Sequence, residues 1–252
     1  MVLSPAQRDQ YWQNGFLLLP ALFAAEELQC LETRFVEIAE DRCPRPESMV
    51  VMRDISFVKG KARGDTPLHE VNKILGFEDD EILYSHSLCP PLLAAVRDLI
   101  GAELMTLTTN VFNKPPGIDG RHPLHQDLRY FSLRPEDGIV AAWTAITATN
   151  RENGCLAMIP GSHREGFHDH GEPDWPELNY GFFAARDVDI RRREYVEMAP
   201  GDTLLFHPLL VHGSGRNRSA HFRRAISTHY ASTRCQRPPS RRKRTSMMRR
   251  IP

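Results

Sequence analysis

The first hundred residues favour helices. Residues 24–42 and 89–101 carry apolar side chains at every third or fourth position, which predicts amphipathic helices. Ser4 followed by Pro5 is a typical helix start and Gly15 a typical stop, so a short helix is also expected over residues 4–14. Two further segments read as strands, residues 15–19 and 49–52. We therefore expect residues 1–101 to form a helix-rich flank.

The pattern changes after Gly101 to short β-branched or aromatic runs separated by turn residues. Strands are predicted over residues 104–113, 122–133, 139–148, 155–160, 195–198, 203–211 and 222–231. Helices followed by many short strands predict a mainly β fold with flanking helices, whose core is a double-sheet jelly roll or a cupin-like barrel.

The predicted organisation is one domain over residues 1–233, with the jelly-roll core in residues 102–233. Residues 167–193 form a long insertion without periodicity. A loop of this length is usually functional or mobile, so it is a candidate substrate lid.

Composition changes this picture little, but the charge distribution adds to it. The 252 residues contain no run of roughly twenty apolar residues, so no membrane span is predicted. The five cysteines are scattered without a Cys-x-x-Cys pair, which is typical of reduced thiols in an intracellular protein. Residues 234–252 hold many Lys and Arg residues and no acid, which leaves the rest of the chain acidic. Such a tail can bind polyanions, but we expect a solvated, disordered end, with nucleic acid an unlikely partner.

The candidate chemistry begins at His125-Gln126-Asp127. Positions i and i+2 of a strand share a face, so His125 and Asp127 are expected to point together while Gln126 points away. With one more imidazole they would form the two-histidine, one-carboxylate triad of non-haem Fe(II). The tripeptide alone is common by chance, so the hypothesis depends on a third ligand.

His212 is the expected third ligand, because it ends an apolar run just before a glycine-rich loop. His207 competes with it, but Pro208 follows His207, and we assign that histidine a structural role.

The predicted strand after His212 carries adjacent arginines. Fe(II) with two neutral imidazoles and one carboxylate keeps one positive charge, so a chelating 2-oxoglutarate dianion leaves its distal carboxylate in need of a partner. An arginine offers a bidentate fork for that group. Arg223 is in phase with Ala225 and Ser227 and is expected to face inward, whereas Arg224 is expected to face solvent.

Together these segments resemble the phytanoyl-CoA dioxygenase family. The resemblance starts near Asn14, runs to about Ala231, and rests on the motifs at residues 125–131, 153–156, 160–163, 206–215 and 222–227. It implies a double-stranded β-helix, Fe(II), 2-oxoglutarate as co-substrate, and ascorbate to keep the iron reduced.

The resemblance also implies roles for single residues. It makes His125, Asp127 and His212 the iron ligands and Arg223 the anchor of 2-oxoglutarate, in agreement with the choice from the residues alone. It further implies that the co-substrate is contacted by Lys73, Trp143, Ser214 and Asn110, the last at a position where the best-known family member has methionine. This chain departs from the family at Arg237, where the family continues with folded chain and this sequence turns basic.

The implied reaction is 2-hydroxylation of a branched-chain fatty acyl-CoA such as phytanoyl-CoA, a step of fatty acid α-oxidation that yields succinate and CO2. The alternatives are hydroxylation of another small molecule by a member of the same family, or an inactive metal-binding regulator acting through the basic tail. A peroxisomal location is implied by the resemblance, although Arg250-Ile251-Pro252 is not the Ser-Lys-Leu address. A cytoplasmic location is the alternative.

Overall fold

The computed structural model describes residues 2–175, 179–237 and 248–251. Its helices are α1 (Pro5–Asn14), α2 (Ala25–Ala39), α3 (Ile55–Val58), α4 (Pro67–Glu70), α5 (Glu81–Ser87) and α6 (Pro90–Ile100), with 3-10 turns η1 (Asp127–Tyr130), η2 (Glu136–Gly138), η3 (Ser162–Glu165) and η4 (Ile190–Arg192). Its strands are β1 (Phe16–Leu19), β2 (Val50–Arg53), β3 (Val71–Leu75), β4 (Leu104–Lys114), β5 (His122–His125), β6 (Ile139–Ala145), β7 (Leu156–Met158), β8 (His170–Gly171), β9 (Ala184–Ala185), β10 (Glu194–Val196), β11 (Thr203–Phe206), β12 (His212–Ser214), β13 (Arg223–Ser232) and β14 (Arg249–Arg250).

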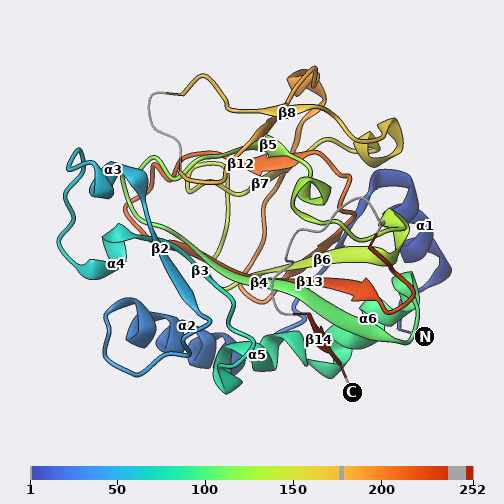
Figure 1. Ribbon diagram of the computed structural model, residues 1–252, viewed down its shortest axis with the longest axis horizontal. Coiled ribbons are helices and arrows are strands. Elements are labelled where there is room, and N and C mark those ends of the chain that lie inside the picture. Colours follow the sequence, from blue (N-terminus) through green and yellow to red (C-terminus); the bar gives the residue numbers. More distant parts are fainter. Residues whose placement is uncertain (1, 176–178, 238–247, 252) are drawn as a thin grey trace.

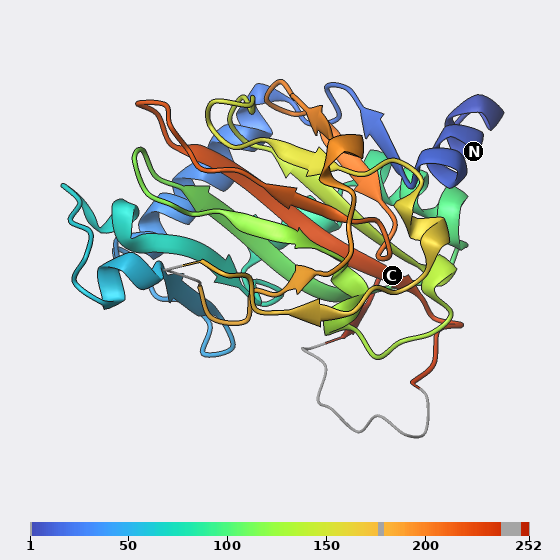
Figure 2. The ribbon, with the colours of Figure 1, turned by 90° about the horizontal axis from the view of Figure 1, so that it is seen from above.

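Two antiparallel sheets face each other, as the predicted jelly roll requires (Figure 1). The large sheet has the order β1-β11-β6-β13-β4-β3-β2, and the small sheet has the order β10-β7-β12-β5. Figure 2 shows the long strands of the large sheet running side by side. The predicted mainly β fold with flanking helices is confirmed.

Helices α2, α5 and α6 cover the face of the large sheet that points away from the small sheet (Figure 1). Apolar side chains of α2 and α5, among them Phe35 and Leu83, pack against Ile226 of β13. Those of α6 pack against Val140 of β6 and Tyr230 of β13. Because side chains alternate along a strand, the intervening residues of β6 and β13 face the small sheet and the interior between the sheets.

Two predicted strands are shorter than expected because the chain changes sheet within them. The segment 122–133 leaves the small sheet after His125 and continues as the turn η1. The segment 203–211 ends its first strand at Phe206 in the large sheet and enters the small sheet at His212. Pro208 lies in this crossing, where it has no N–H to donate to a ladder. His212 therefore begins a strand, and the expectation that it ends one is wrong.

The predicted outward direction of Arg224 is also wrong. This side chain is 7 % exposed, because α2 covers the face of β13 to which it points. Its guanidinium pairs with Glu32 of α2, and its Nε donates to Asn113 Oδ1 at 3.2 Å. The arginine thus links the helical layer to the large sheet.

Part of the basic tail is ordered, contrary to expectation. β14 pairs with Thr106 and Met105 of β4, along the edge that β3 leaves open, and Ile251 joins the apolar cluster beneath α6. The Arg249 guanidinium donates to Glu78 O and lies over the Tyr84 ring. The expectation of disorder for residues 238–247 concerns a segment outside the described residues.

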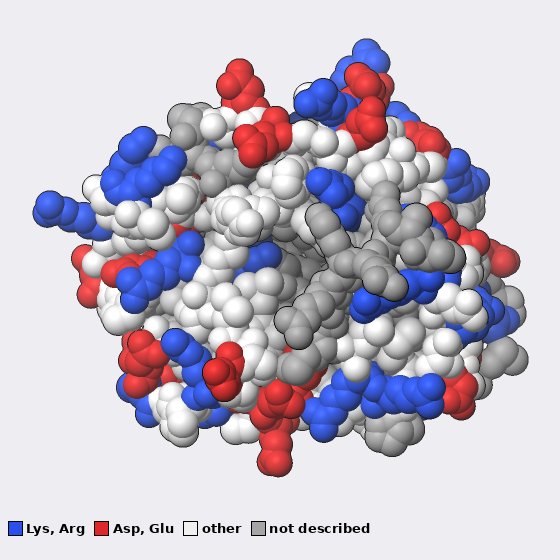
Figure 3. All heavy atoms as spheres, viewed as in Figure 1, with Lys and Arg blue, Asp and Glu red and all other residues white. Residues whose placement is uncertain are grey.

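Charge on the face shown in Figure 3 is mixed, since Lys and Arg side chains lie interspersed with Asp and Glu. Among the described helices, none has the length and apolar character needed to cross a membrane.

The Arg224 contacts predict a specific loss of stability. Arg224→Met would leave Glu32 and Asn113 without this partner, so the free energy of unfolding should fall by about 1–3 kcal/mol. Arg218→Met, at an exposed position of the loop before β13, should change it by less than about 0.5 kcal/mol. Denaturant unfolding of both variants measures the difference. Equal stability of the two would contradict the role given to Arg224.

Candidate metal centre

The three predicted metal ligands converge at the end of the small sheet. His125 is the last residue of β5, His212 is the first residue of β12, and the two are direct partners across the strand pair. Asp127 opens η1, so it reaches the site from a turn and not from the strand that we expected. One ligand atom from each residue lies within 4.8 Å of the other two, and all three side chains are buried.

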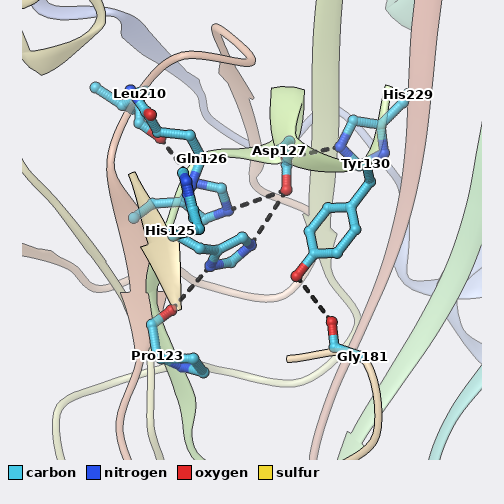
Figure 4. A network of polar contacts seen from close by, with 10 residues as sticks. Pro123, His125, Gln126, Asp127, Tyr130, Gly181, Leu210 and His229 are labelled. Carbon is cyan, nitrogen blue, oxygen red and sulfur yellow. Dashed lines mark hydrogen bonds and ion pairs between the residues drawn. The ribbon is translucent and has the colours of Figure 1, made fainter. Parts of the chain in front are cut away.

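Backbone carbonyls fix both imidazoles in one tautomer. His125 Nδ1 donates to Pro123 O at 2.8 Å, and His212 Nδ1 donates to Leu210 O at 3.0 Å (Figure 4). A carbonyl only accepts, so each proton sits on Nδ1 and each Nε2 carries a free lone pair. The Nε2 atoms lie 3.2 Å and 3.7 Å from Asp127 Oδ1. Three lone pairs therefore meet at one place.

The protonation states suit a metal. Burial lowers the pKa of His212 to about 4, against the opposing effect of Asp127, so this imidazole is neutral at neutral pH. Burial opposes ionisation of Asp127, but the neighbouring His212 and His229, together with the hydrogen bond from His229, hold its pKa well below the ordinary value. Two imidazole nitrogens and one carboxylate oxygen, with further positions left open, are the donor set that suits non-haem Fe(II).

His229 is a residue of the candidate site that the sequence did not reveal. It lies on β13 of the large sheet, and its Nε2 donates to Asp127 Oδ2 at 2.7 Å (Figure 4). This bond occupies one carboxylate oxygen and leaves Oδ1 toward the imidazoles. Alternation along β13 could have predicted that His229 faces inward, because it is in phase with Arg223. No local motif, however, links His229 to Asp127.

His122 extends the stack of rings beside the site. Its ring lies 4.2 Å from that of His125 and 4.0 Å from that of Phe182, nearly parallel to both. Burial and the neighbouring His125 hold its pKa well below the ordinary value, so it is neutral. His122 thus packs the first imidazole in place.

Gln126 points away from the ligands, as predicted. Its Nε2 donates to Gly166 O at 2.8 Å and Leu209 O at 2.7 Å, and its Oε1 accepts from His168 N at 2.8 Å. The residue between the two ligands therefore fastens the start of the 167–193 insertion and the crossing before β12 to the site. His207 has the structural role assigned to it, with Nε2 against Asp137 Oδ1 at 3.1 Å.

A cavity on one side of the triad collects three of the residues predicted to contact the co-substrate. Trp143, Ser214 and Arg223 line it together with the three ligands. Arg223 is 2 % exposed, as the predicted inward direction requires. Its Nη2 donates to Gly154 O at 3.1 Å, and its Cζ lies 5.5 Å from the Trp143 ring. Burial lowers the pKa of Arg223 to about 9, so the guanidinium is charged at neutral pH.

A second cavity of about 300 Å³ adjoins the triad and holds the other two predicted residues, Lys73 and Asn110. Its remaining lining is largely apolar and aromatic, with Phe112, Phe131 and Phe182. Lys73 Nζ lies 5.2 Å from the Phe182 ring, and burial lowers its pKa to about 8. The two cavities share His125 and Asp127 in their walls, so they meet at the candidate metal position.

Comparison with known proteins agrees with this geometry. A family model described as phytanoyl-CoA dioxygenase (PhyH) matches residues 11–225. The chain belongs to this family. It is 42% identical over 239 residues to a probable phytanoyl-CoA dioxygenase of Caenorhabditis elegans, an alignment that covers 92% of this chain and 76% of the relative. It is 38% identical to the peroxisomal phytanoyl-CoA dioxygenase of Homo sapiens, with 93% and 70% covered.

Solved structures support the fold of this family member. EctD from S. alaskensis superposes with a TM-score of 0.74 at 17% identity, covering 98% of this chain and 84% of that one. The carbocyclase SnoK, described as non-haem and α-ketoglutarate-dependent, gives a TM-score of 0.71 at 20% identity, with 99% and 97% covered. At these identities the likeness concerns the fold. Family membership and the triad together make the chain a 2-oxoglutarate-dependent non-haem dioxygenase.

The triad predicts how the protein responds to loss of a ligand. Asp127→Ala removes the only anionic donor of the three, so affinity for Co(II), used as an oxygen-stable stand-in for Fe(II), should fall about a hundredfold or more. His221→Ala, at an exposed position, should bind Co(II) like the parent protein. Absorbance titration with Co(II) measures both. Unchanged Co(II) binding by Asp127→Ala would refute the site.

His229 predicts a smaller effect through Asp127. His229→Leu removes the hydrogen bond to Asp127 Oδ2, so Co(II) affinity should fall about 10–100-fold. His229→Gln keeps an N–H donor and should retain more of the affinity. The same titration distinguishes them, and equal affinities for His229→Leu and the parent would show that this bond does not position the ligand.

Proposed function

We propose that this dioxygenase uses Fe(II) and 2-oxoglutarate to hydroxylate carbon 2 of a branched-chain fatty acyl-CoA such as phytanoyl-CoA, with release of succinate and CO2. The observation that carries the proposal is the division of space around the triad. A small cavity with Arg223 in its wall lies on one side, and a larger, mainly apolar cavity with Lys73 in its wall adjoins it. The names of relatives 38% and 42% identical support the substrate class.

Three residues would hold the iron, namely His125, Asp127 and His212. When bound, the iron supplies the redox chemistry that consumes O2 and 2-oxoglutarate. The chain supplies two imidazoles and one carboxylate in fixed orientations, with His229 keeping Asp127 in place. Ascorbate would maintain the ferrous state.

The cationic cavity would bind 2-oxoglutarate. Arg223 is buried with its Nε unpaired among the described groups, and it points into the cavity beside Ser214 and Trp143. A carboxylate there would gain a bidentate, charge-assisted pair and would offset the cost of burying the guanidinium. Arg223 is thus the proposed anchor of the distal carboxylate, and Ser214 and Trp143 are proposed to complete its surroundings.

The apolar cavity would hold the part of the substrate's acyl chain that lies next to the thioester linking it to CoA. Phe112, Phe131 and Phe182 exclude water from the space next to the metal, which protects the oxidising chemistry from side reactions. Lys73 and Asn110 are the polar groups of this cavity that we propose to contact 2-oxoglutarate where the two cavities meet. With a pKa of about 8, Lys73 is largely an ammonium at neutral pH and attracts an anion.

Two further parts of the proposal rest on family likeness, and a third rests on the structure. The peroxisomal location follows the names of the mammalian relatives, and the role in fatty acid α-oxidation follows from 2-hydroxylation of the proposed substrate. The 167–193 insertion is the proposed lid, since Phe182 within it lines both cavities.

The decisive experiment measures succinate. The protein is incubated with Fe(II) and 2-oxoglutarate under anaerobic conditions and then exposed to O2, with and without phytanoyl-CoA. Succinate should rise severalfold with phytanoyl-CoA, and mass spectrometry should show one added oxygen on the acyl chain. The Asp127→Ala variant should form no succinate, whether phytanoyl-CoA is present or absent.

Each other outcome has a clear meaning. Succinate that forms in equal amounts with and without phytanoyl-CoA, but rises with another small molecule, would contradict the substrate and leave the enzyme class in place. Binding of 2-oxoglutarate without turnover of any acyl-CoA would favour the regulator.

A further inference from the structure

Two buried basic side chains lie side by side at the end of the cationic cavity. Lys114 of β4 and Arg223 of β13 are direct partners across the antiparallel pair, so their side chains leave the sheet on the same face. They are 4 % and 2 % exposed, and both line the cavity that adjoins the triad. Of the two, only Arg223 was predicted from the sequence to bind the co-substrate.

Neither cation has a carboxylate partner among the described residues. Lys114 Nζ donates to two backbone carbonyls, Gly120 O and Gly215 O, the second at 2.8 Å. Arg223 donates to Gly154 O, and its Nε has no partner. Among the described residues that line this cavity, Asp127 is the one acidic residue, and it belongs to the metal triad.

This arrangement is costly for the protein alone. Two like charges in a buried site repel each other. Burial lowers the pKa of Lys114 well below its ordinary value and Arg223 adds to the effect, while the more distant Asp119 and Asp54 oppose it only in part. Carbonyl partners satisfy hydrogen bonds but do not neutralise charge. An ammonium has three N–H groups, and Lys114 uses two of them on the carbonyls. A bound anion would supply both the missing charge and the missing acceptor.

We propose that Lys114 and Arg223 together form the receptor for the distal carboxylate of the 2-oxo acid, and that Lys114 makes the site select a dicarboxylate over a monocarboxylate. The inference rests on the proposed function and adds a specificity residue to it. Arg223 provides the planar fork, and Lys114 provides a second charge from the neighbouring strand.

A purely structural role for Lys114 has a different signature. Gly120 precedes β5 and Gly215 follows β12, so the two carbonyl bonds also tie together the loops that flank the metal ligands. If that were its whole function, loss of Lys114 would weaken every 2-oxo acid equally.

The test compares two acids on protein loaded with redox-inert Ni(II). Isothermal titration calorimetry measures the Kd of 2-oxoglutarate and of 2-oxopentanoate. The second acid has the same five carbons, with a methyl group in place of the distal carboxylate. Lys114→Met should weaken 2-oxoglutarate about 10–100-fold, as expected for one charge-assisted hydrogen bond, and 2-oxopentanoate less than about threefold. Lys61→Met, which removes an exposed lysine, should change neither.

A second variant guards against misfolding. Lys114→Gln keeps N–H donors for the carbonyls but carries no charge, and it should show the same selective loss. Thermal melting confirms that each variant is folded before titration. Equal weakening of both acids, or no weakening of either, would overturn the inference.

Failure of the inference and failure of the proposed function are distinguishable. A parent protein that prefers 2-oxoglutarate, with the same preference retained in both Lys114 variants, contradicts only the role of Lys114. A parent protein that binds neither acid contradicts the proposed function and the inference with it.

Discussion

The buried carboxylate of Asp127 is the constraint on which the rest of the structure depends. An ionised carboxylate away from water requires partners, and here they come from both sheets. His125 and His212 approach from the small sheet, and His229 approaches from the large one. The site therefore exists only when the two sheets close on each other. A metal ion would replace the direct contacts at Oδ1 without disturbing the hydrogen bond at Oδ2.

Strand β13 connects the two ends of the site. Its inward positions carry Arg223 at the proposed co-substrate end and His229 beside the triad, while Ile226 and Tyr230 pack against helices on the other face. The same alternation that builds the core thus spaces the functional groups. Since β13 is buried on both faces, its register against β4 and β6 is strongly determined. That register sets the distance from the cationic pair to the triad.

The sequence predicted which residues form the candidate site better than it predicted the local structure that carries them. His125, Asp127, His212 and Arg223 could be named because their chemistry depends on residue type and order along the chain. Their local structure was partly wrong, since Asp127 lies in a turn and His212 begins a strand, and periodicity within one segment does not reveal where a chain changes sheet. The buried position of Arg224 and the partners of Lys114, His229 and β14 depend on contacts between distant segments, so no local pattern contains them.

Charge connects the metal and the co-substrate in the proposed reaction. Without ligands the interior holds three basic side chains, Lys73, Lys114 and Arg223, and the negative charge of Asp127, and Fe(II) adds two positive charges. The 2-oxoglutarate dianion places one carboxylate by the metal and one by the cationic pair, so it reduces the buried charge at both ends. A 2-oxo acid with a single carboxylate reduces the buried charge at the metal but not at Lys114 and Arg223. The spacing of the two sites along β13 therefore favours an acid with two carboxylates, and the apolar second cavity is left for a neutral portion of the substrate.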